Sequence, residues 1–152
     1  MNHTSREAFL PVIRALAETF QAFEQFSAQH IRQMDLTPPQ FDVVATLGNT
    51  AGMSCKTLSE KTLITKGTLT GVIDRLEEKG IVERSPMKHD RRSIFIALTP
   101  QGEALFARVF PAHVQYMKTA FERFTHHELE TYTVELAQLK QAFTHAMEQQ
   151  PG

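Results

Sequence analysis

The sequence predicts a mainly α-helical protein with one small β-hairpin, flanked by long helices at both ends of the chain. Apolar residues recur at three- and four-residue steps near both termini, which is the period of an amphipathic helix. Short helical segments between residues 37 and 80 are bounded by capping residues and glycines. Two short segments, residues 81–84 and 93–98, flank a polar, charged turn and indicate two paired strands.

The first long helix is expected from about Ser5 to Met34. Its apolar positions are Phe9, Val12, Ile13, Leu16, Phe20, Phe23, Ser27 and Ile31. In the following segment, Thr37 is a suitable cap, Pro38 suits a first helical position and Gln40 completes a capping box. These signals predict a second helix that ends at Gly48.

A short helix beginning at Ser54 or Thr57 is expected next, followed by a turn near residues 63–64. Thr65 is the expected cap of the next helix, which Gly80 ends. This helix would bury one side only, through Leu69, Val72, Ile73 and Leu76. The hairpin then follows, with an expected long turn over residues 85–92.

Two helices complete the chain. The first is expected from Thr99-Pro100 to about Phe124, with a bend at Pro111. A capping box from Thr125 to Glu128 opens the second. The apolar residues of this last helix form a seam of the coiled-coil kind: Leu129, Tyr132, Leu136, Leu139, Phe143 and Met147.

Composition is that of a globular protein, because 41% of its 152 residues are hydrophobic and 22% are charged. No apolar run approaches the ~20 residues that span a bilayer, and the first residues do not resemble a secretory signal. A single cysteine, Cys55, allows no internal disulfide. We therefore expect a cytoplasmic protein without a membrane partner.

The net charge of −1 conceals a local basic excess. Residues 53–92 contain nine Lys or Arg and six Asp or Glu, and the rest of the chain is acidic. Because only the local charge meets a partner, the neutral total does not exclude a polyanion as the partner of this segment.

Two helices joined by a tight turn, the second buried on one side only, have the arrangement of a DNA-binding helix-turn-helix. The outward side of that second helix begins with small, hydroxyl and basic residues: Lys66, Gly67, Thr68, Thr70 and Gly71. Such residues allow a close approach to base edges and phosphates. Asp74, Glu77 and Glu78 follow and would repel phosphates, so we expect only the first two turns to enter the major groove.

The turn of the hairpin is the second expected DNA contact. It contains Lys88, His89, Asp90, Arg91 and Arg92. A basic β-turn beside a recognition helix reaches the neighbouring minor groove, where arginine is favoured. Asp90 is expected to hold Arg92 by a charge-assisted pair.

The sequence resembles the MarR family of transcriptional regulators from about residue 36 to residue 105. The segments that carry the resemblance are Leu36-Thr37-Pro38-Pro39-Gln40-Phe41, Leu58-Ser59-Glu60-Lys61, Thr68-Leu69-Thr70, Asp74-Arg75-Leu76-Glu77, Gly80-Ile81-Val82-Glu83-Arg84, Asp90-Arg91-Arg92 and Leu98-Thr99-Pro100-Gln101-Gly102. The resemblance implies a homodimeric regulator, usually a repressor, that reads a pseudo-palindromic operator in double-stranded DNA. It also implies that Thr65 to Gly71 contact the major groove, that Arg75 contacts a phosphate or braces the helix, and that Arg92 enters the minor groove.

The expected organisation is a winged helix-turn-helix domain at residues 36–100 and a dimerisation region at residues 1–35 and 101–152. Dimerisation would also bury the apolar seams at the two ends of the chain. Many members of the family release DNA when a small aromatic or phenolic acid binds between these regions. By position, such an effector would meet Phe23, Ser27, His30, Phe41, Phe110 and His113, although these residues also fit an ordinary core and surface.

Other functions have weaker support in the sequence. We expect Cys55 to be a small, partly buried structural residue. The alternative is a regulator that senses oxidants through the thiol of Cys55. The segment His127-Glu128-Leu129-Glu130-Thr131 lacks the second histidine of a zinc protease motif. We therefore predict no catalytic residues, no metal site and no cofactor. The remaining alternative is a protein-interaction module that keeps the winged fold and has lost DNA binding.

Overall fold

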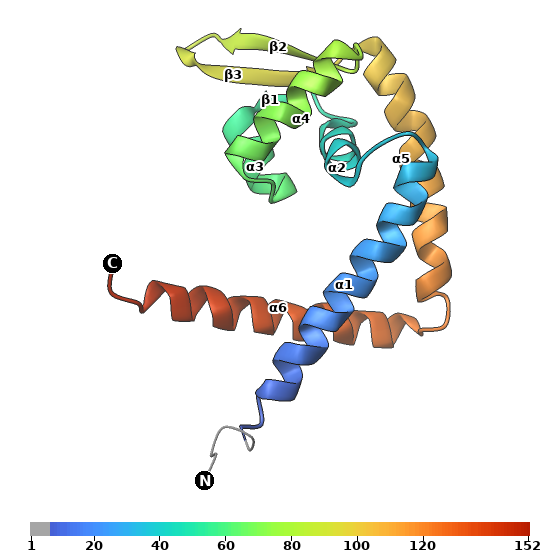
Figure 1. Cartoon of the computed structure of the whole chain (residues 1–152), viewed down its shortest axis with the longest axis vertical. Helices are drawn as coiled ribbons and strands as arrows, with labels where there is room; N and C mark the ends of the chain where they lie inside the picture. Colours follow the sequence, from blue (N-terminus) through green and yellow to red (C-terminus); the bar gives the residue numbers. More distant parts are fainter. Residues whose placement is uncertain (1–6) are drawn as a thin grey trace. The chain divides into compact units, whose positions relative to one another are not determined.

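The computed structural model describes residues 7–152, apart from the side chain of Arg91. The chain forms two compact units, residues 1–115 and residues 116–152. Mostly helical structure with a small three-stranded sheet confirms the predicted fold class (Figure 1). None of the described helices is both long enough and apolar enough to cross a membrane.

The first two helices are α1 (Leu10–Gln33) and α2 (Pro38–Leu47). Helix α1 begins later than expected, with Pro11 in its first turn, and Ser5 lies outside the described residues. The capping box of α2 is confirmed: Gln40 N–H donates to Thr37 Oγ1 over 3.3 Å, and Thr37 N–H donates to Gln40 Oε1 over 3.1 Å. Gly48 ends α2, as expected.

Helices α3 (Cys55–Thr62) and α4 (Lys66–Glu78) form the helix-turn-helix. Ser54, the first of the two expected starts, caps α3 by accepting from Thr57 N–H. Leu63 makes the turn in a left-handed conformation, with φ of 61°. Thr65 occupies the N-cap position of α4 but accepts no backbone hydrogen bond there, and its hydroxyl donates to Thr68 Oγ1 instead.

The sheet contains β1 (Met53–Ser54), β2 (Val82–Met87) and β3 (Asp90–Leu98), in the order β1-β3-β2. Strand β1 was not expected, because two residues leave no period to detect. The expected long turn over residues 85–92 was wrong. Strands β2 and β3 continue through most of it, with Met87 opposite Asp90, and only Lys88 and His89 remain as the turn.

One core lies under the helix-turn-helix and the sheet. Its most deeply buried side chains come from α2, α3, α4 and both long strands: Val43, Val44, Leu47, Leu58, Leu69, Ile73, Leu76, Val82 and Ile96. Ile31 of α1 belongs to the same cluster. Burial of this one side leaves the other side of α4 free for a partner, as the sequence predicted.

The last helices are α5 (Pro100–Phe121) and α6 (His126–Glu148). Helix α5 ends earlier than expected and contains Pro111. Gly102 sits against Ile81, the residue before β2, where an added Cβ would lie 2.1 Å from the carbonyl oxygen, so only glycine permits this packing. Half of the expected capping box of α6 is confirmed, because Glu128 N–H donates to Thr125 Oγ1. The Glu128 carboxylate accepts from the Thr125 hydroxyl instead of from the backbone N–H of Thr125.

Candidate nucleic-acid interface

The exposed side of α4 begins with the residues that the sequence singled out. Lys66, Gly67, Thr68, Thr70 and Gly71 are all exposed. The Thr70 hydroxyl donates to the carbonyl of Lys66, so part of its hydrogen-bonding capacity is used within the helix. Neither glycine has any atom within 4 Å of the place where a Cβ would stand. This helix therefore presents a smooth, uncrowded surface over its first two turns.

Substitution of Gly71 by alanine should change the stability of the protein and its affinity for DNA in opposite directions. The free protein should gain about 0.5–1 kcal/mol of unfolding free energy, because alanine is the better helix former and the Cβ meets nothing. A duplex packed closely on α4 would lose about 1 kcal/mol of binding, since the methyl group enters the contact. Thermal unfolding and fluorescence anisotropy on the same variant test both parts. Unchanged affinity would show that α4 does not approach DNA closely at this position.

Arg84 of β2 joins the wing to α4. Its guanidinium donates to the Glu77 carboxylate over 2.9 Å and forms a second ion pair with Asp74. The expectation that Asp74 and Glu77 simply repel phosphates was therefore incomplete, because one cation from the adjacent strand pairs with both carboxylates and offsets part of their charge. The same contacts set the position of the hairpin relative to the recognition helix.

The wing differs from its expected form at Asp90 and Arg92. The Asp90 carboxylate accepts from the backbone N–H of Arg92 over 3.0 Å and from the Ser93 hydroxyl over 3.2 Å. Within the part of the chain that the structure describes, Arg92 makes no ion pair with Asp90. Asp90 thus anchors the backbone, and the guanidinium of exposed Arg92 is left for an external anion. Lys88 and His89 are exposed at the turn, and the side chain of Arg91 lies outside the described residues.

Four of the six residues expected at an effector site form one cluster. The Ser27 hydroxyl lies 3.1 Å from Nε2 of His113, and His30 Nδ1 lies 3.0 Å from His113 Nδ1. The Phe41 ring packs edge-on against His113, with 4.6 Å between centroids. His113 is only 7% exposed, so it is a hydrogen-bonded group of the interior rather than an open ligand contact.

The other two residues, Phe23 and Phe110, make no hydrogen bond or ring contact with this cluster that the structure records. Phe110 stacks on Phe106 with 5.1 Å between centroids. Phe23 and Ser27 line a hollow of about 380 Å³ between α1 and α2, together with Arg32 and Asp42. Asp42 is exposed as a residue, but partial burial of its carboxyl raises the pKa to about 6. This hollow offers apolar, cationic and protonatable groups within one small volume.

Protonation of His113 should lower stability in mild acid. Burial, and then the neighbouring His30, lower the pKa of His113 below its ordinary 6.5. The unfolded chain therefore binds more protons just below pH 6.5, and stability is lost as the pH falls through that value. Asp42, with its raised pKa, acts in the opposite direction between about pH 4 and 6.

A comparison with His113→Leu isolates the histidine, because Asp42 is present in both proteins. The unfolding free energy of the wild type should fall more than that of the variant between about pH 7.5 and pH 5.5. Urea unfolding at the two pH values measures the difference. Equal losses would mean that His113 titrates alike in the folded and unfolded chains.

Cys55 is half-buried at the start of α3 and packs against the core. Among the described residues, no group of three His, Cys, Asp or Glu side chains is arranged to hold a metal ion. The chemistry that the surface does offer is that of anion contact, from α4 and from the wing beside it.

A helix-turn-helix with an exposed second helix and an adjacent β-hairpin defines a winged helix-turn-helix DNA-binding protein. The model for the MarR family matches residues 36–94. The uncharacterized HTH-type transcriptional regulator YsmB of Bacillus subtilis is 30% identical over 127 residues, which are 84% of this chain and 87% of YsmB. The HTH-type transcriptional regulator MhqR of the same organism is 26% identical, over 84% of this chain and 88% of MhqR.

Solved structures agree with this match. Bordetella bronchiseptica BpsR, whose DNA binding is regulated by 6-hydroxynicotinic acid, is 27% identical with a TM-score of 0.76, over 86% of this chain and 98% of BpsR. A mutant of E. coli MarR bound to operator DNA is 24% identical with a TM-score of 0.77, over 88% and 98% of the two chains. The chain belongs to the MarR family and is a transcriptional regulator rather than an enzyme.

Proposed function

We propose that the protein is a homodimeric repressor that binds a pseudo-palindromic operator and releases it when a small aromatic acid binds. The observation that carries the proposal is the exposed, small-residue surface of α4 beside a wing with an available arginine. In the proposed complex, Thr65 to Gly71 read the major groove and Arg92 enters the minor groove. The operator-bound relatives, such as E. coli MarR, support this assignment by their shared fold.

Dimerisation is proposed through residues 1–35 and 101–152, with residues 36–100 as the DNA-binding domain. Large apolar side chains are exposed on α1, including Leu10, Ile13, Phe20 and Phe23, and Phe9 at its N-cap is exposed as well. Helix α6 has no buried residue at all, although Tyr132, Leu136, Phe143 and Met147 lie on it. Apolar surface of this kind is typical of a protein interface. A second copy of the chain is the partner that we propose for it.

The proposed effector is a small aromatic carboxylic acid. The hollow between α1 and α2 has a volume within the usual range for ligand sites, and Phe23 and Arg32 suit a ring and a carboxylate. BpsR, whose DNA binding responds to 6-hydroxynicotinic acid, supports a compound of this class. Of the cluster around His113, Ser27 lines this hollow and connects it with the buried histidine.

Binding to DNA from the region upstream of the protein's own gene tests the proposed function. Saturable binding at low salt is expected, with a steep loss of affinity as salt rises, because phosphate contacts release counterions. Addition of 6-hydroxynicotinic and salicylic acids to the complex tests release. Failure to bind any duplex selected from a random library at low salt would favour the alternative, an interaction module that has lost DNA binding.

A further inference from the structure

We infer that His30 and His113 form a proton-responsive contact between α1 and α5, and that its separation in mild acid weakens DNA binding. This inference rests on the proposed function and adds a second input to it, since the signal is a proton rather than an aromatic acid. The two residues, which we call the histidine pair, belong to one compact unit of the chain, residues 1–115.

The histidine pair lies at the point where both long helices meet α2. Along the whole of α1, the buried residues are Ala28 and Ile31, in the same turn as His30. His113 is the last buried residue on α5. The Phe41 ring of α2 packs edge-on against His113, with 4.6 Å between centroids. Separation of the pair would therefore act where α1, α2 and α5 are fixed to one another.

The contact between the two imidazoles is made by one shared hydrogen. Nδ1 of His30 lies 3.0 Å from Nδ1 of His113, and 19° separates the planes of the two rings. One of these nitrogens must therefore donate an N–H while the other accepts it with its lone pair. Nε2 of His113 lies 3.1 Å from the Ser27 hydroxyl, so both ring nitrogens of His113 are engaged.

This arrangement accepts one added proton but not two. A protonated His30 keeps a hydrogen on Nδ1 and still donates it to His113. When His113 is protonated as well, both Nδ1 atoms carry hydrogen, the shared bond is lost and two positive charges face each other. His113 is only 7% exposed, so burial adds to the cost of its charge. The second proton is thus the one that separates the pair.

The direction of the pH response follows from the closed pair. Burial, and then the charge of His30, lower the pKa of His113 below its ordinary 6.5. A separated and hydrated imidazole would regain that ordinary pKa. Separation therefore takes up a proton below about pH 6.5, so acid favours the separated form and neutral pH favours the closed one.

The charged groups nearest the pair lie in the hollow between α1 and α2, beside Ser27. They are Glu24, Arg32 and Asp42. Asp42 also titrates in this range, because partial burial raises its pKa to about 6. Phe41, the residue of α2 in contact with the pair, carries no charge. An Asp42 variant is therefore the control that the test needs on this side.

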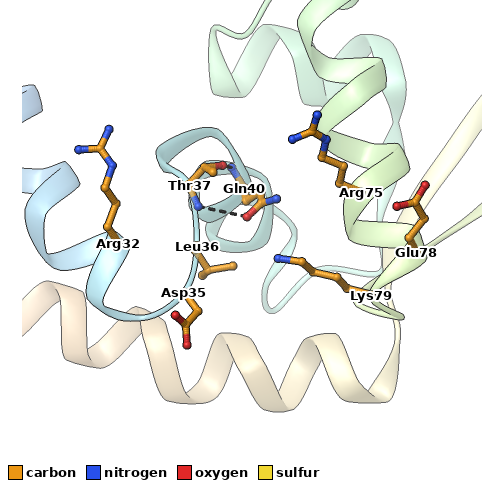
Figure 2. A pocket seen from close by; sticks show the side chains of 8 residues that line it. All are labelled: Arg32, Asp35, Leu36, Thr37, Gln40, Arg75, Glu78 and Lys79. Carbon is orange, nitrogen blue, oxygen red and sulfur yellow. Dashed lines mark hydrogen bonds between the residues drawn. The ribbon is translucent and has the colours of Figure 1, made fainter.

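Other charged and titratable groups close to the pair along its own helices have different surroundings. At the end of α1, Arg32 and Asp35 line a second hollow, whose other residues come from the start of α2 and from α4 (Figure 2). On α5, Tyr116 lies one turn beyond His113, and phenols do not ionise in mild acid. The histidine pair is therefore the group whose geometry the second proton changes.

Separation of the pair is expected to reach DNA through the spacing of the recognition helices. In the proposed dimer, α1 and α5 belong to the dimerisation region and α2 belongs to the DNA-binding domain. Two recognition helices bind successive major grooves when they lie about 34–36 Å apart. Movement at the junction of the two regions alters that distance, and each protomer contributes one histidine pair.

The affinity of the full-length protein for a selected duplex, at constant salt from about pH 7.5 to pH 5.5, tests the inference. The wild type should bind about tenfold more weakly at the lower pH, because release of DNA takes up a proton in each protomer. Protonation of His89 in the wing adds a positive charge and acts in the opposite direction. Circular dichroism at each pH restricts the comparison to folded protein.

Four variants identify the group that responds. His30→Gln should lose the pH response, because an amide offers either a donor or an acceptor to Nδ1 of His113. His113→Leu, which takes up no proton, should lose it as well and replaces His30→Gln if that variant does not fold. Asp42→Asn should retain the response. His127→Gln removes an exposed histidine of α6 and is the matched control, which should also retain it.

The outcomes separate this inference from the proposed function. An equal loss of affinity in the wild type, His30→Gln and His113→Leu would overturn the inference, and so would a wild-type affinity that does not fall in acid. Both results leave the proposed function standing, because the duplex is bound at pH 7.5. Absence of duplex binding by the wild type at pH 7.5 would overturn the proposed function and this inference with it.

Discussion

Deletion of residues 126–152, which form α6 and the end of the chain, is expected to convert the proposed dimer into monomers and to weaken operator binding by about 10²–10⁴-fold. Helix α6 has no buried residue within the chain, so its apolar face would remain exposed to water in a monomer. Two linked recognition helices bind a two-fold operator with the advantage of a high effective concentration, and a monomer loses that advantage. Sedimentation equilibrium and DNA-binding measurements on the truncated protein check both effects.

Point substitutions keep this prediction testable if the truncated protein does not fold. Leu136→Lys with Phe143→Lys places two charges on the exposed apolar face of α6. Gln138→Lys adds a charge on the opposite side of the same helix and is the matched control. The double variant should be monomeric and the control dimeric. A dimer that persists in the double variant would mean that α6 is not part of the interface.

Arg92→Ala is expected to weaken operator binding by about 1–3 kcal/mol while leaving the dimer intact. The backbone of Arg92 is held by Asp90, and the arginine makes no ion pair with that carboxylate. Loss of the guanidinium therefore removes an external contact and breaks no internal one, so the unfolding temperature should not change. Fluorescence anisotropy on the operator and a thermal melt measure the two quantities.

Two further variants define what Arg92 does. Arg92→Lys should recover only part of the affinity, because lysine keeps the charge but lacks the planar donor group. Asp90→Ala should weaken binding in spite of removing a negative charge, since the backbone of the wing loses its anchor. Full affinity in Arg92→Ala would show that the wing makes no contact on which binding depends.

Local signals in the sequence predicted the helix boundaries well where the chemistry is local. The caps at Thr37 and Thr125 depend on residues three positions apart, and both are present in the structure. Thr65 shows the limit of this reasoning, because a threonine at an N-cap position has another hydroxyl, Thr68, within reach. The wing was predicted too short because polar residues in a two-stranded ribbon look like those of a loop.

Contacts between distant segments could not be predicted in the same way. Strand β1 is recognisable only from its pairing of Met53 with Ile96. The pairing of Asp74 and Glu77 with a cation depends on Arg84, which the sequence places in a different element. Similarly, Arg32 and Lys79 line one hollow only after α1 and α4 have packed around α2. The residues of the candidate interface were thus foreseeable from their types, whereas their charge balance required the fold.

The spacing of two half-sites tests the central claim most directly. Once a bound duplex has been selected, five base pairs are inserted between its half-sites, which turns one of them about half a helical turn away. A dimer with one recognition helix in each of two major grooves should lose most of its affinity for this duplex. It should also lose affinity for a duplex with ten inserted base pairs, which restores the facing but moves the half-sites about one helical turn further apart. Equal binding to the original and to both altered duplexes would contradict a dimeric regulator that reads DNA through α4.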